Sequence, residues 1–376
     1  MSGPPELRIL LVDDDGSVLS GLRHVLRSER HRWAVRVAEG SEAALAALAE
    51  EPADVVVSDM RMPGMNGLEL LGRVLAGWPA TVRVLLSGWS DTGSITRAGT
   101  VAHRYLLKPC DAETLRAELS GIQEIRALLP DPGLRAALGA LRSLPSSPET
   151  LQALRNLPED PEARDRAVAA AVETDVALAT RVLQFASSPS FGAPRPVAGL
   201  RDALGLVGHL VLLEIASLLE PLASSSLLPG ASDSLVRLEH HARMAARMAR
   251  ILAPDEASAD AASTAALLHD AGRLALLSRL PVPYAEVLRR SLEGHGALEQ
   301  IEVEVLGATH ARIGAYLLGL WGLPRTIVDA VARHHDPDVL DDPGLAGLVA
   351  SANLFAHQAD AAARSAPGAA LERSIR

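Results

Sequence analysis

Four apolar runs in the first third of the chain each end in side chains that can take part in phosphate chemistry. These residues are Asp13 with Asp14, Asp59, Ser87 and Lys108. Three carboxylates brought together repel one another and need a divalent cation such as Mg²⁺, which prefers oxygen ligands. A carboxylate so placed can attack phosphorus and form an aspartyl phosphate, while an ammonium group and a hydroxyl hold the phosphoryl oxygens. The pattern therefore predicts phosphoryl transfer to an aspartate.

A second group of residues with metal-binding side chains lies after residue 235. His and Asp are ligands for first-row transition metals. Adjacent residues on a helix point about 100° apart, so His269 and Asp270 could serve two neighbouring metals, or one could bind while the other bridges. With two metals, a bound hydroxide would attack a phosphodiester. The members of the group are His240 or His241, His269, Asp270, His310, His334 and His335.

The first 125 residues alternate apolar runs with amphipathic helical patterns, which is typical of a parallel sheet covered by helices on both faces. In such a doubly wound α/β domain, chemistry takes place at the carboxyl ends of the strands. We therefore expect the polar residues of the first group to meet at one edge of a five-stranded parallel sheet. The predicted strands are 7–12, 33–38, 54–58, 82–87 and 104–108, with helical segments over 41–50 and 66–78.

Strand patterns end near residue 125, and the remaining chain is predicted to be all-α, because apolar residues recur with a helical period. Residues 129–149 are rich in Pro, Gly and Ser, which predicts a linker over 126–145 that leads into helices. The length of 376 residues also favours a multidomain chain. The expected divisions are an α/β domain over 1–125, the linker, a helical domain over 146–345, and a C-terminal helix and tail over 346–376.

The composition argues against several classes of protein. A net charge of −10 is unfavourable for a nucleic-acid surface, which needs clustered Lys and Arg. The single cysteine, Cys110, cannot form an internal disulfide and fits a reducing compartment. Acidic residues occur too early for a signal peptide, and the apolar stretch 203–219 contains His209 and Glu214, which favours a buried helix over a membrane span. These features predict a cytoplasmic protein without membrane contact.

The motifs of the first 125 residues resemble the receiver domain of bacterial two-component response regulators. The resemblance covers about residues 6–125 and rests on ILLVDDD, ADVVVSDMRMPGMNGLEL, VRVLLSGWSD and RYLLKP. It implies that Asp59 is the phosphoacceptor and that the Lys108–Pro109 peptide is cis. The implied Mg²⁺ ligands are Asp13, Asp14, Asp59 and the backbone carbonyl of Arg61. The residues implied to contact the phosphate or switch with it are Ser87, Tyr105 and Lys108.

The order of the histidines resembles that of the HD superfamily, in particular its cyclic-di-GMP phosphodiesterase branch, HD-GYP. The order His, His-Asp, His, His-His is the same. This chain departs from that branch at three places, however. Arg273 stands where the branch has Lys, and no Gly-Tyr-Pro signature follows His335. Asn353 stands near the position of the closing Asp ligand, so charge and supporting contacts are missing from a metal site.

The segments before the histidines resemble the HDOD domain, the HD-related output domain. The resemblance covers about residues 140–340 and includes LRSLPSSPETLQALRNL, VETDVALATRVLQFASSPSFG and YLLGLWGLPRTIVDAVARHHDP. Ser187 departs from the Asn that is usual in the family's NS step. HDOD domains are generally regarded as non-catalytic signalling modules. The family's opening His, with Ala five positions later, favours His240 with Ala245 over His241.

We therefore interpret His269 and Asp270 as a retained pair inside the helical core rather than a working centre. Two alternatives are kept. The surviving ligands could bind a divalent transition metal, or the chain could be a receiver-gated, metal-dependent phosphodiesterase acting on cyclic di-GMP. A transcription factor ranks last, because its basic candidate helix, 241–250, lies in the HD-like core.

Together the two resemblances imply a phosphorylation-controlled response regulator. A sensor histidine kinase would phosphorylate Asp59, and Ser87 and Tyr105 would respond. The linker would pass this change to a protein-binding surface on the helical domain. The sequence does not identify the downstream protein, and it leaves dimerisation on phosphorylation open.

Overall fold

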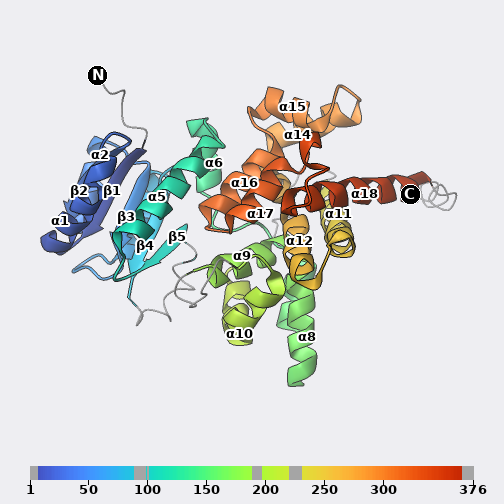
Figure 1. The fold of residues 1–376 in the computed structure, drawn as a ribbon, viewed down its shortest axis with the longest axis horizontal. Coiled ribbons are helices and arrows are strands. Elements are labelled where there is room, and N and C mark those ends of the chain that lie inside the picture. Colours follow the sequence, from blue (N-terminus) through green and yellow to red (C-terminus); the bar gives the residue numbers. More distant parts are fainter. Residues whose placement is uncertain (1–6, 89–98, 100, 189–196, 220–230, 366–376) are drawn as a thin grey trace. The chain divides into compact units, whose positions relative to one another are not determined.

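A computed structural model of the chain describes residues 7–88, 99, 101–188, 197–219 and 231–365 (Figure 1). The chain divides into two compact units. The first unit comprises Met1–Ser143, Gln184–Arg195 and Tyr316–Leu323, and the second comprises Leu144–Leu183, Pro196–Ala315 and Pro324–Arg376. A five-stranded sheet followed by a mostly helical region agrees with the predicted fold class.

The first unit is built on a parallel sheet (Figure 1). Its strands are β1 Leu7–Asp13, β2 Trp33–Glu39, β3 Val55–Asp59, β4 Val82–Ser87 and β5 Arg104–Leu107. The helices between and after them are α1 Gly16–Val25, η1 Leu26–Glu29, α2 Ser41–Glu50, α3 Gly67–Gly77 and α5 Ala112–Ala127. The strand order β2-β1-β3-β4-β5 reverses direction between β1 and β3, which places a crevice at the carboxyl ends of these two strands. All five predicted strands are confirmed.

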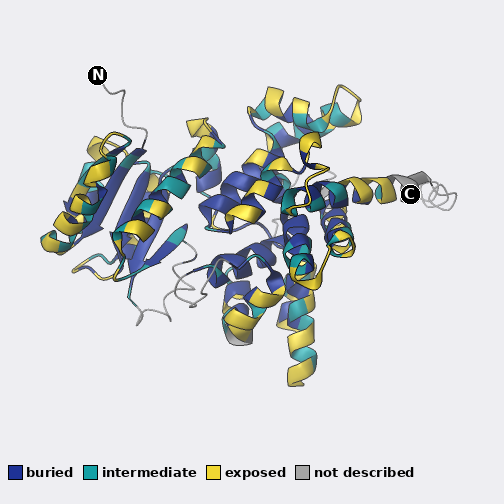
Figure 2. Cartoon of the chain, viewed as in Figure 1, coloured by how far each residue is buried: buried dark blue, intermediate teal, exposed yellow. Residues whose placement is uncertain are grey.

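Both faces of the sheet are covered, as the continuous apolar strands predict. Successive side chains along a strand point to opposite faces. Leu10, Val56 and Leu85 belong to an apolar cluster that includes residues of α2 and α3. The alternate residues Ile9 and Val57 are also buried, at 0% and 1% exposure, so the opposite face is covered as well. Figure 2 shows the strands as mostly buried.

Capping residues fix the two helices that border the crevice. The side chain of Asp15 accepts a hydrogen bond from the backbone N–H of Ser17 at the start of α1. Asn66 and Glu69 form a reciprocal capping box at the start of α3. A Cβ on Gly67 would lie 2.0 Å from the backbone carbonyl oxygen of Asp59, so only glycine lets α3 begin this close to β3.

The stretch predicted to be a linker is partly helical, which differs from the expectation. Helix α6 spans Pro132–Gly139, and its last residue packs against the sheet unit. A Cβ on Gly139 would lie 2.1 Å from the carbonyl oxygen of Pro79. Arg83 of β4, only 2% exposed, donates from Nη2 to the carbonyl oxygen of Gly139 at 3.1 Å. Proline begins this helix and glycine permits its close approach, so the same two residue types that indicated a linker are used to dock a helix.

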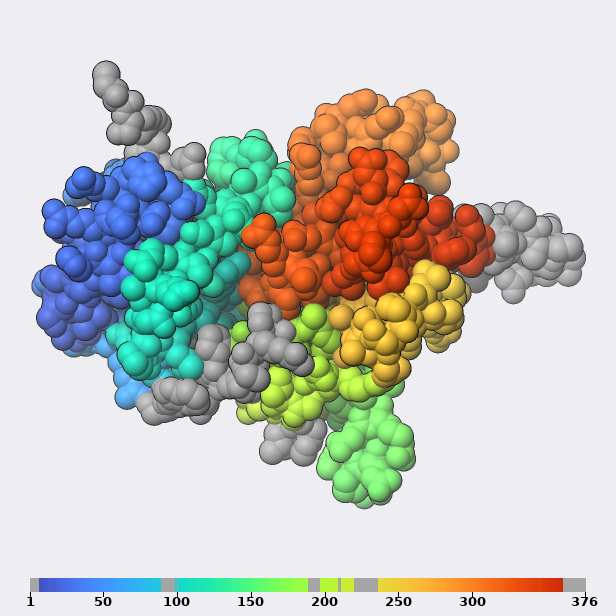
Figure 3. Space-filling model, in the orientation of Figure 1, coloured from blue at the N-terminus to red at the C-terminus, as the bar shows by residue number. Residues whose placement is uncertain are grey.

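The second unit is built from helices (Figure 1). Those after Ser143 are α7 Pro148–Arg155, α8 Pro161–Val172, α9 Val176–Ala186, α10 Leu200–Ser217, α11 Ala231–Leu252, α12 Glu256–Leu268, α13 Ala271–Arg279, α14 Pro281–Leu292, α15 Leu298–Leu306, α16 His310–Leu320, α17 Arg325–Arg333, η5 Pro337–Val339 and α18 Leu345–Ser365. Helix α11 packs against α12 and α18, and α17 packs against α18. In the space-filling view, α14 and α15 (orange) lie against each other (Figure 3).

The apolar stretch 203–219 lies mainly in α10. Gly208 interrupts this helix with φ +70° and ψ +160°, a backbone conformation that suits glycine. Among the described helices, none combines the length and apolar character needed to cross a membrane.

Candidate functional sites

The carboxylates predicted to bind Mg²⁺ lie together at the crevice of the sheet. Oxygen atoms of Asp13, Asp14 and Asp59 lie within 4.8 Å of one another. This proximity follows from the parallel pairing of β1 with β3, because both strands end at the same edge. Asp13 and Asp59 are buried, at 3% and 7% exposure, whereas Asp14 is exposed to solvent. The cluster is therefore anchored in the protein and open on one side.

Lys108, directly after β5, is the cation of this cluster. Its Nζ lies 2.7 Å from Oδ2 of Asp13 and 2.6 Å from Oδ1 of Asp59. Burial works to lower the pKa of Lys108, but the hydrogen bonds to the two carboxylates outweigh it and raise that pKa. The backbone N–H of Arg61 donates to the other Asp59 oxygen at 2.9 Å. The Lys108–Pro109 peptide is cis, as predicted.

Ser87 and Tyr105 lie on the adjacent strands β4 and β5. Ser87 is 1% exposed, and its Oγ has no hydrogen-bond partner among the residues that the structure describes. The backbone N–H of Lys108 donates to the Ser87 carbonyl oxygen at 2.8 Å, which fixes the two residues in register. Tyr105 is 6% exposed and belongs to the apolar cluster with α2 and α3. The buried hydroxyl of Ser87 can turn toward a new acceptor.

The donor set at the sheet edge fits a magnesium ion. Three carboxylates face one ammonium group, so the cluster carries excess negative charge that a divalent cation would offset. The available donors are oxygens, the type that Mg²⁺ prefers over nitrogen or sulfur. The ligand set with the Arg61 carbonyl, and the separate roles of Ser87, Tyr105 and Lys108, stay predictions.

The second unit contains a buried histidine cluster with two overlapping groups of metal-ligand type. Asp270, at the junction of α12 and α13, belongs to both groups. The ligand atoms within each group lie within 4.8 Å of one another. The groups are Asp270, His310, His334 and His335, and His241, His269 and Asp270. Among these residues only His335 is exposed, and the others are at most 5% exposed.

The charge of Asp270 is compensated by the protein itself. Nη1 of Arg273 lies 3.0 Å from its Oδ2, and Nε2 of His310 lies 3.2 Å from its Oδ1. Burial works to raise the pKa of Asp270, but Arg273, His269 and His310 hold it well below its usual value. Arg273 also donates from Nε to the hydroxyl of Tyr284 at 3.1 Å. Asp270 is therefore a buried, ionised carboxylate between two cationic groups.

His310 has a carboxylate on each side of its ring. Its Nδ1 donates to Oε2 of Glu302 at 2.7 Å, and its Nε2 faces Asp270. Glu302 is 0% exposed and also accepts from the backbone N–H of His310 at 2.8 Å. Burial works to lower the pKa of His310, but the two carboxylates raise it to about 9. A protonated imidazole has no lone pair to offer, so a metal ion could bind Nε2 of His310 only by displacing its proton.

His269 and His334 are the two histidines that keep a ring nitrogen for another ligand. Their Nδ1 atoms donate to the carbonyl oxygens of Ala266 and Val331, at 2.6 and 2.7 Å. Their buried Nε2 atoms have no hydrogen-bond partner within the described ranges and lie 3.6 and 3.8 Å from oxygens of Asp270. Burial lowers the pKa of His269 to about 4 and that of His334 well below its usual value, so both rings are neutral.

His241, not His240, joins the cluster, which corrects the choice made from the family pattern. The side chain of His240 is 59% exposed, whereas that of His241 is 6% exposed. Neighbouring residues on α11 point about 100° apart, so only one of them can face the core. Nδ1 of His241 lies 3.0 Å from Oδ2 of Asp360, and its Nε2 lies 2.9 Å from Oδ1 of Asn353.

Several members of the cluster were not identified from the sequence. Carboxylates such as Glu302 and Asp360 lie in amphipathic helical patterns, where an acidic residue normally indicates a solvent-facing position. Only tertiary contacts reveal their histidine partners. A cavity of about 260 Å³ has His241 and Arg273 in its wall. The residues missed are Tyr284, Glu299, Glu302, His357 and Asp360.

Models of two protein families match the chain. The model of the HDOD domain matches residues 144–337, more than half of the chain. The model of the response regulator receiver domain matches residues 9–120. The receiver match contains the sheet-edge carboxylates, and the HDOD match contains the histidine cluster from His241 to His335.

Similar proteins include two bacterial regulators. The hydrogenase transcriptional regulatory protein HoxA of Cupriavidus necator is 35% identical over 103 residues, which are 27% of this chain and 21% of HoxA. The DNA-binding response regulator MtrA of Mycolicibacterium smegmatis is 37% identical over 113 residues, 30% of this chain and 48% of MtrA. This chain thus spans between about a fifth and a half of these relatives. The solved structure of the MmoQ response regulator from Methylococcus capsulatus is 29% identical and covers 60% of this chain and 90% of its own, with a TM-score of 0.48.

Proposed function

This chain belongs to the response regulators that join a receiver domain to an HDOD domain, and we propose that phosphorylation of Asp59 controls its output. In this proposal a sensor histidine kinase supplies the phosphoryl group. Mg²⁺, held by Asp13, Asp14, Asp59 and the carbonyl of Arg61, offsets the charge that develops on the phosphoryl oxygens. The observation that carries the proposal is Nζ of Lys108 within 2.7 Å of both buried carboxylates, because this ammonium group can stabilise an added phosphoryl group.

Phosphorylation replaces the carboxylate of Asp59 by a group with more charge and more acceptor oxygens. The buried hydroxyl of Ser87, which lacks a hydrogen-bond partner among the described residues, is suited to donate to one of those oxygens. Movement of Ser87 frees space beside β5, and Tyr105 adjusts in its apolar cluster. The chemical event thereby becomes a change in the packing of β4 and β5.

Helix α6 is the element best placed to carry this change onward. Strand β4 contains both Ser87 and Arg83, and Arg83 is bonded to the end of α6 through the carbonyl oxygen of Gly139. The guanidinium of Arg83 has further bonds to the carbonyl oxygens of Thr81 and Val101, at 3.1 and 2.6 Å. A shift of β4 therefore pulls on the segment that leads into the HDOD domain.

We infer that the HDOD domain is a non-catalytic output domain that binds a downstream protein. Two features support this inference. The charge of Asp270 is already balanced by Arg273 and His310, and His310 is protonated. A hydrolytic two-metal centre would need His310 as a ligand and would need the negative charge of Asp270 to be available to the metals.

The test of the phosphorylation step uses the intact protein and acetyl phosphate with Mg²⁺. We expect the mass of one phosphoryl group to be added to the wild-type chain and not to the Asp59→Asn variant. Beryllofluoride, a phosphoryl mimic, should then change the set of proteins retained in a pull-down with the wild type alone. No mass change on a folded wild-type chain would refute the proposal.

A second candidate function, a metal-dependent phosphodiesterase, is favoured by one observation. The neutral His269 and His334 each keep a buried Nε2 without a hydrogen-bond partner in the described part of the chain. These atoms and Asp270 would hold a transition metal, which would supply an activated water. Metal analysis of the purified protein and a cyclic-di-GMP hydrolysis assay test this function. Turnover that is lost in both His269→Ala and Asp270→Ala would establish it.

A further inference from the structure

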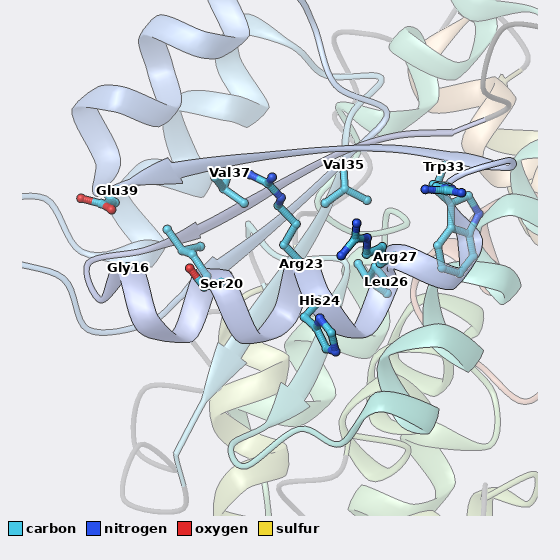
Figure 4. A pocket seen from close by; sticks show the side chains of 12 residues that line it. Gly16, Ser20, Arg23, His24, Leu26, Arg27, Trp33, Val35, Val37 and Glu39 are labelled. Carbon is cyan, nitrogen blue, oxygen red and sulfur yellow. The ribbon is translucent and has the colours of Figure 1, made fainter.

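A groove on the first unit lies between α1, η1 and strand β2 (Figure 4). Its Gly16–Glu39 end adjoins the carboxylate cluster, because Glu39 is paired with Asp13, and its other end is at Trp33. Its volume is about 560 Å³. Trp33, Val35 and Val37, alternate residues of β2, line it on the strand side. Arg23, Arg27 and Arg30 line it on the helical side. We propose that this groove binds an extended acidic segment of a partner protein.

The three groove arginines lack a partner in the part of the chain that the structure describes. Their side chains are exposed and form neither an ion pair nor a hydrogen bond with a described residue. Nearby arginines differ, because Arg32 pairs with Glu29 at 3.5 Å. That pair uses the nearby carboxylate of Glu29, and no described carboxylate forms an ion pair with the three groove arginines. The row is therefore available to neutralise acidic groups from outside.

The spacing of the arginines fits an extended peptide. Arg23 lies in α1 and Arg27 in the 3₁₀ turn η1 that follows it. At rises of about 1.5 and 2.0 Å per residue, the two are separated by roughly 6–8 Å along the chain axis. Side chains on one face of a strand repeat about every 6.6 Å. In Figure 4, Arg23 reaches toward Val37 and Arg27 toward Val35. Acidic residues at alternate positions of an extended segment would thus meet successive arginines.

The position of β2 in the sheet supports the same ligand. Within the described residues, β2 is hydrogen-bonded only to β1, so its outer edge can pair with an added strand. Alternate side chains of such a strand would point to the face on which Trp33, Val35 and Val37 lie. Trp33 is 2% exposed and its Nε1 donates to Gln123 at 3.0 Å, so the apolar floor is fixed before a ligand arrives.

Two features limit what the groove can bind. At the other end of β2, a carboxylate oxygen of Glu39 would lie 2.6 Å from a Cβ on Gly16, so this end is acidic and repels a longer anion. The apolar floor offers nothing to a sugar–phosphate backbone. A short acidic segment with apolar residues is therefore favoured over a nucleic acid.

The test measures the binding of a short fluorescein-labelled peptide of alternating Glu and Val to the full chain, by fluorescence anisotropy at low salt. We expect saturable binding that weakens by about tenfold or more in the variant Arg23→Gln/Arg27→Gln/Arg30→Gln. The variant Arg73→Gln/Arg155→Gln/Arg312→Gln removes the same charge from exposed arginines outside the groove and should bind like the wild type. Circular dichroism and phosphorylation by acetyl phosphate check that the variants are folded.

A reversed-charge pair makes the test independent of overall charge. A chain with Arg23→Glu, Arg27→Glu and Arg30→Glu should no longer bind the Glu–Val peptide and should instead bind a Lys–Val peptide. The proposal is overturned if the wild type does not bind the Glu–Val peptide at about 1 mM. It is also overturned if both glutamine variants bind equally, or if single-stranded DNA competes as well as the peptide. If the arginines only protect the strand edge, the groove variant will self-associate without any change in peptide affinity.

Discussion

The carboxylate cluster of the sheet and the histidine cluster of the helical unit use charged groups in opposite ways. At the sheet edge, three carboxylates lie near one ammonium group, that of Lys108, which pairs with Asp13 and Asp59, while Asp14 is open to solvent. In the helical unit, the carboxylates of Asp270 and Glu302 are matched by Arg273 and a protonated His310. The first cluster has unbalanced charge that a cation and a phosphoryl group can use. In the second, the protein's own cations balance these carboxylates, although His335 is exposed.

This difference shows why ligand-type residues alone do not define a working site. Both clusters bring metal-binding side chains within 4.8 Å of one another. What separates them is the charge left over once the protein's own contacts are made. Arg273 contributes to this balance, because its guanidinium bonds to both Asp270 and Tyr284.

The largest difference between the clusters should appear on chelation. Removing Mg²⁺ with EDTA should abolish phosphorylation of Asp59 by acetyl phosphate, because the carboxylates then lack their divalent cation. The same treatment should leave hydrogen exchange of α12 and α13 unchanged. Intact mass spectrometry and exchange mass spectrometry give the two readouts. Faster exchange in these helices would mean that a bound metal supports the histidine cluster.

A large loss of stability should follow the removal of one internal cation. The variant Arg273→Met leaves Asp270 with a poorly compensated buried charge, which we expect to cost about 3–5 kcal/mol in the unfolding free energy. The matched variant Arg289→Met loses only exposed ion pairs with Glu286 and Glu293 and should leave the unfolding free energy nearly unchanged. Urea unfolding measures both. Equal effects would contradict the charge balance described for Asp270.

The helical unit should also become less stable at alkaline pH. The pKa of His310 is raised from an ordinary 6.5 to about 9, so its contribution is complete below pH 6.5 and is lost as the pH rises through 9. The loss should amount to roughly 3 kcal/mol. Urea unfolding from pH 6.5 to 9.5 should show this decline in the wild type and a flatter profile in His310→Gln. Parallel profiles would show that His310 is not the group responsible.

The smallest effect concerns magnesium affinity at the sheet edge. Lys108→Met removes the cation that competes with Mg²⁺ for Asp13 and Asp59. We expect Mg²⁺ to bind about three- to tenfold more tightly, since each nearby charge contributes on the order of 1 kcal/mol near the surface. Isothermal titration calorimetry measures the change. Weaker binding would mean that Lys108 positions the carboxylates more than it competes with the metal.

The sheet and its carboxylate cluster could be predicted because their signals are local. Apolar runs define the strands, and a parallel sheet brings the ends of those runs to one edge, so Asp13 and Asp59 had to approach each other. The resemblance to receiver domains also implied the cis peptide before Pro109, which the structure contains. In this unit, the direction and order of the strands are enough to predict which side chains meet at the edge of the sheet.

The histidine cluster could be predicted only in part, because its partners depend on how helices pack. One helical step decides between His240 and His241, and the family pattern favoured the exposed one. Glu302 and Asp360 have no local signal that distinguishes them from surface acids. Composition was misleading for α6, where Pro132 and Gly139 start and dock a helix rather than form a flexible connection.

The near-complete enclosure of His269 and His334 has a consequence for timing. An ion in bulk solvent has no direct route to their free nitrogen atoms, so loading would depend on transient separation of the helices or on their first assembly. Occupancy would then record the conditions under which each molecule was made. Two preparations of identical sequence, one grown with zinc and one without, would stay different long after transfer to the same buffer.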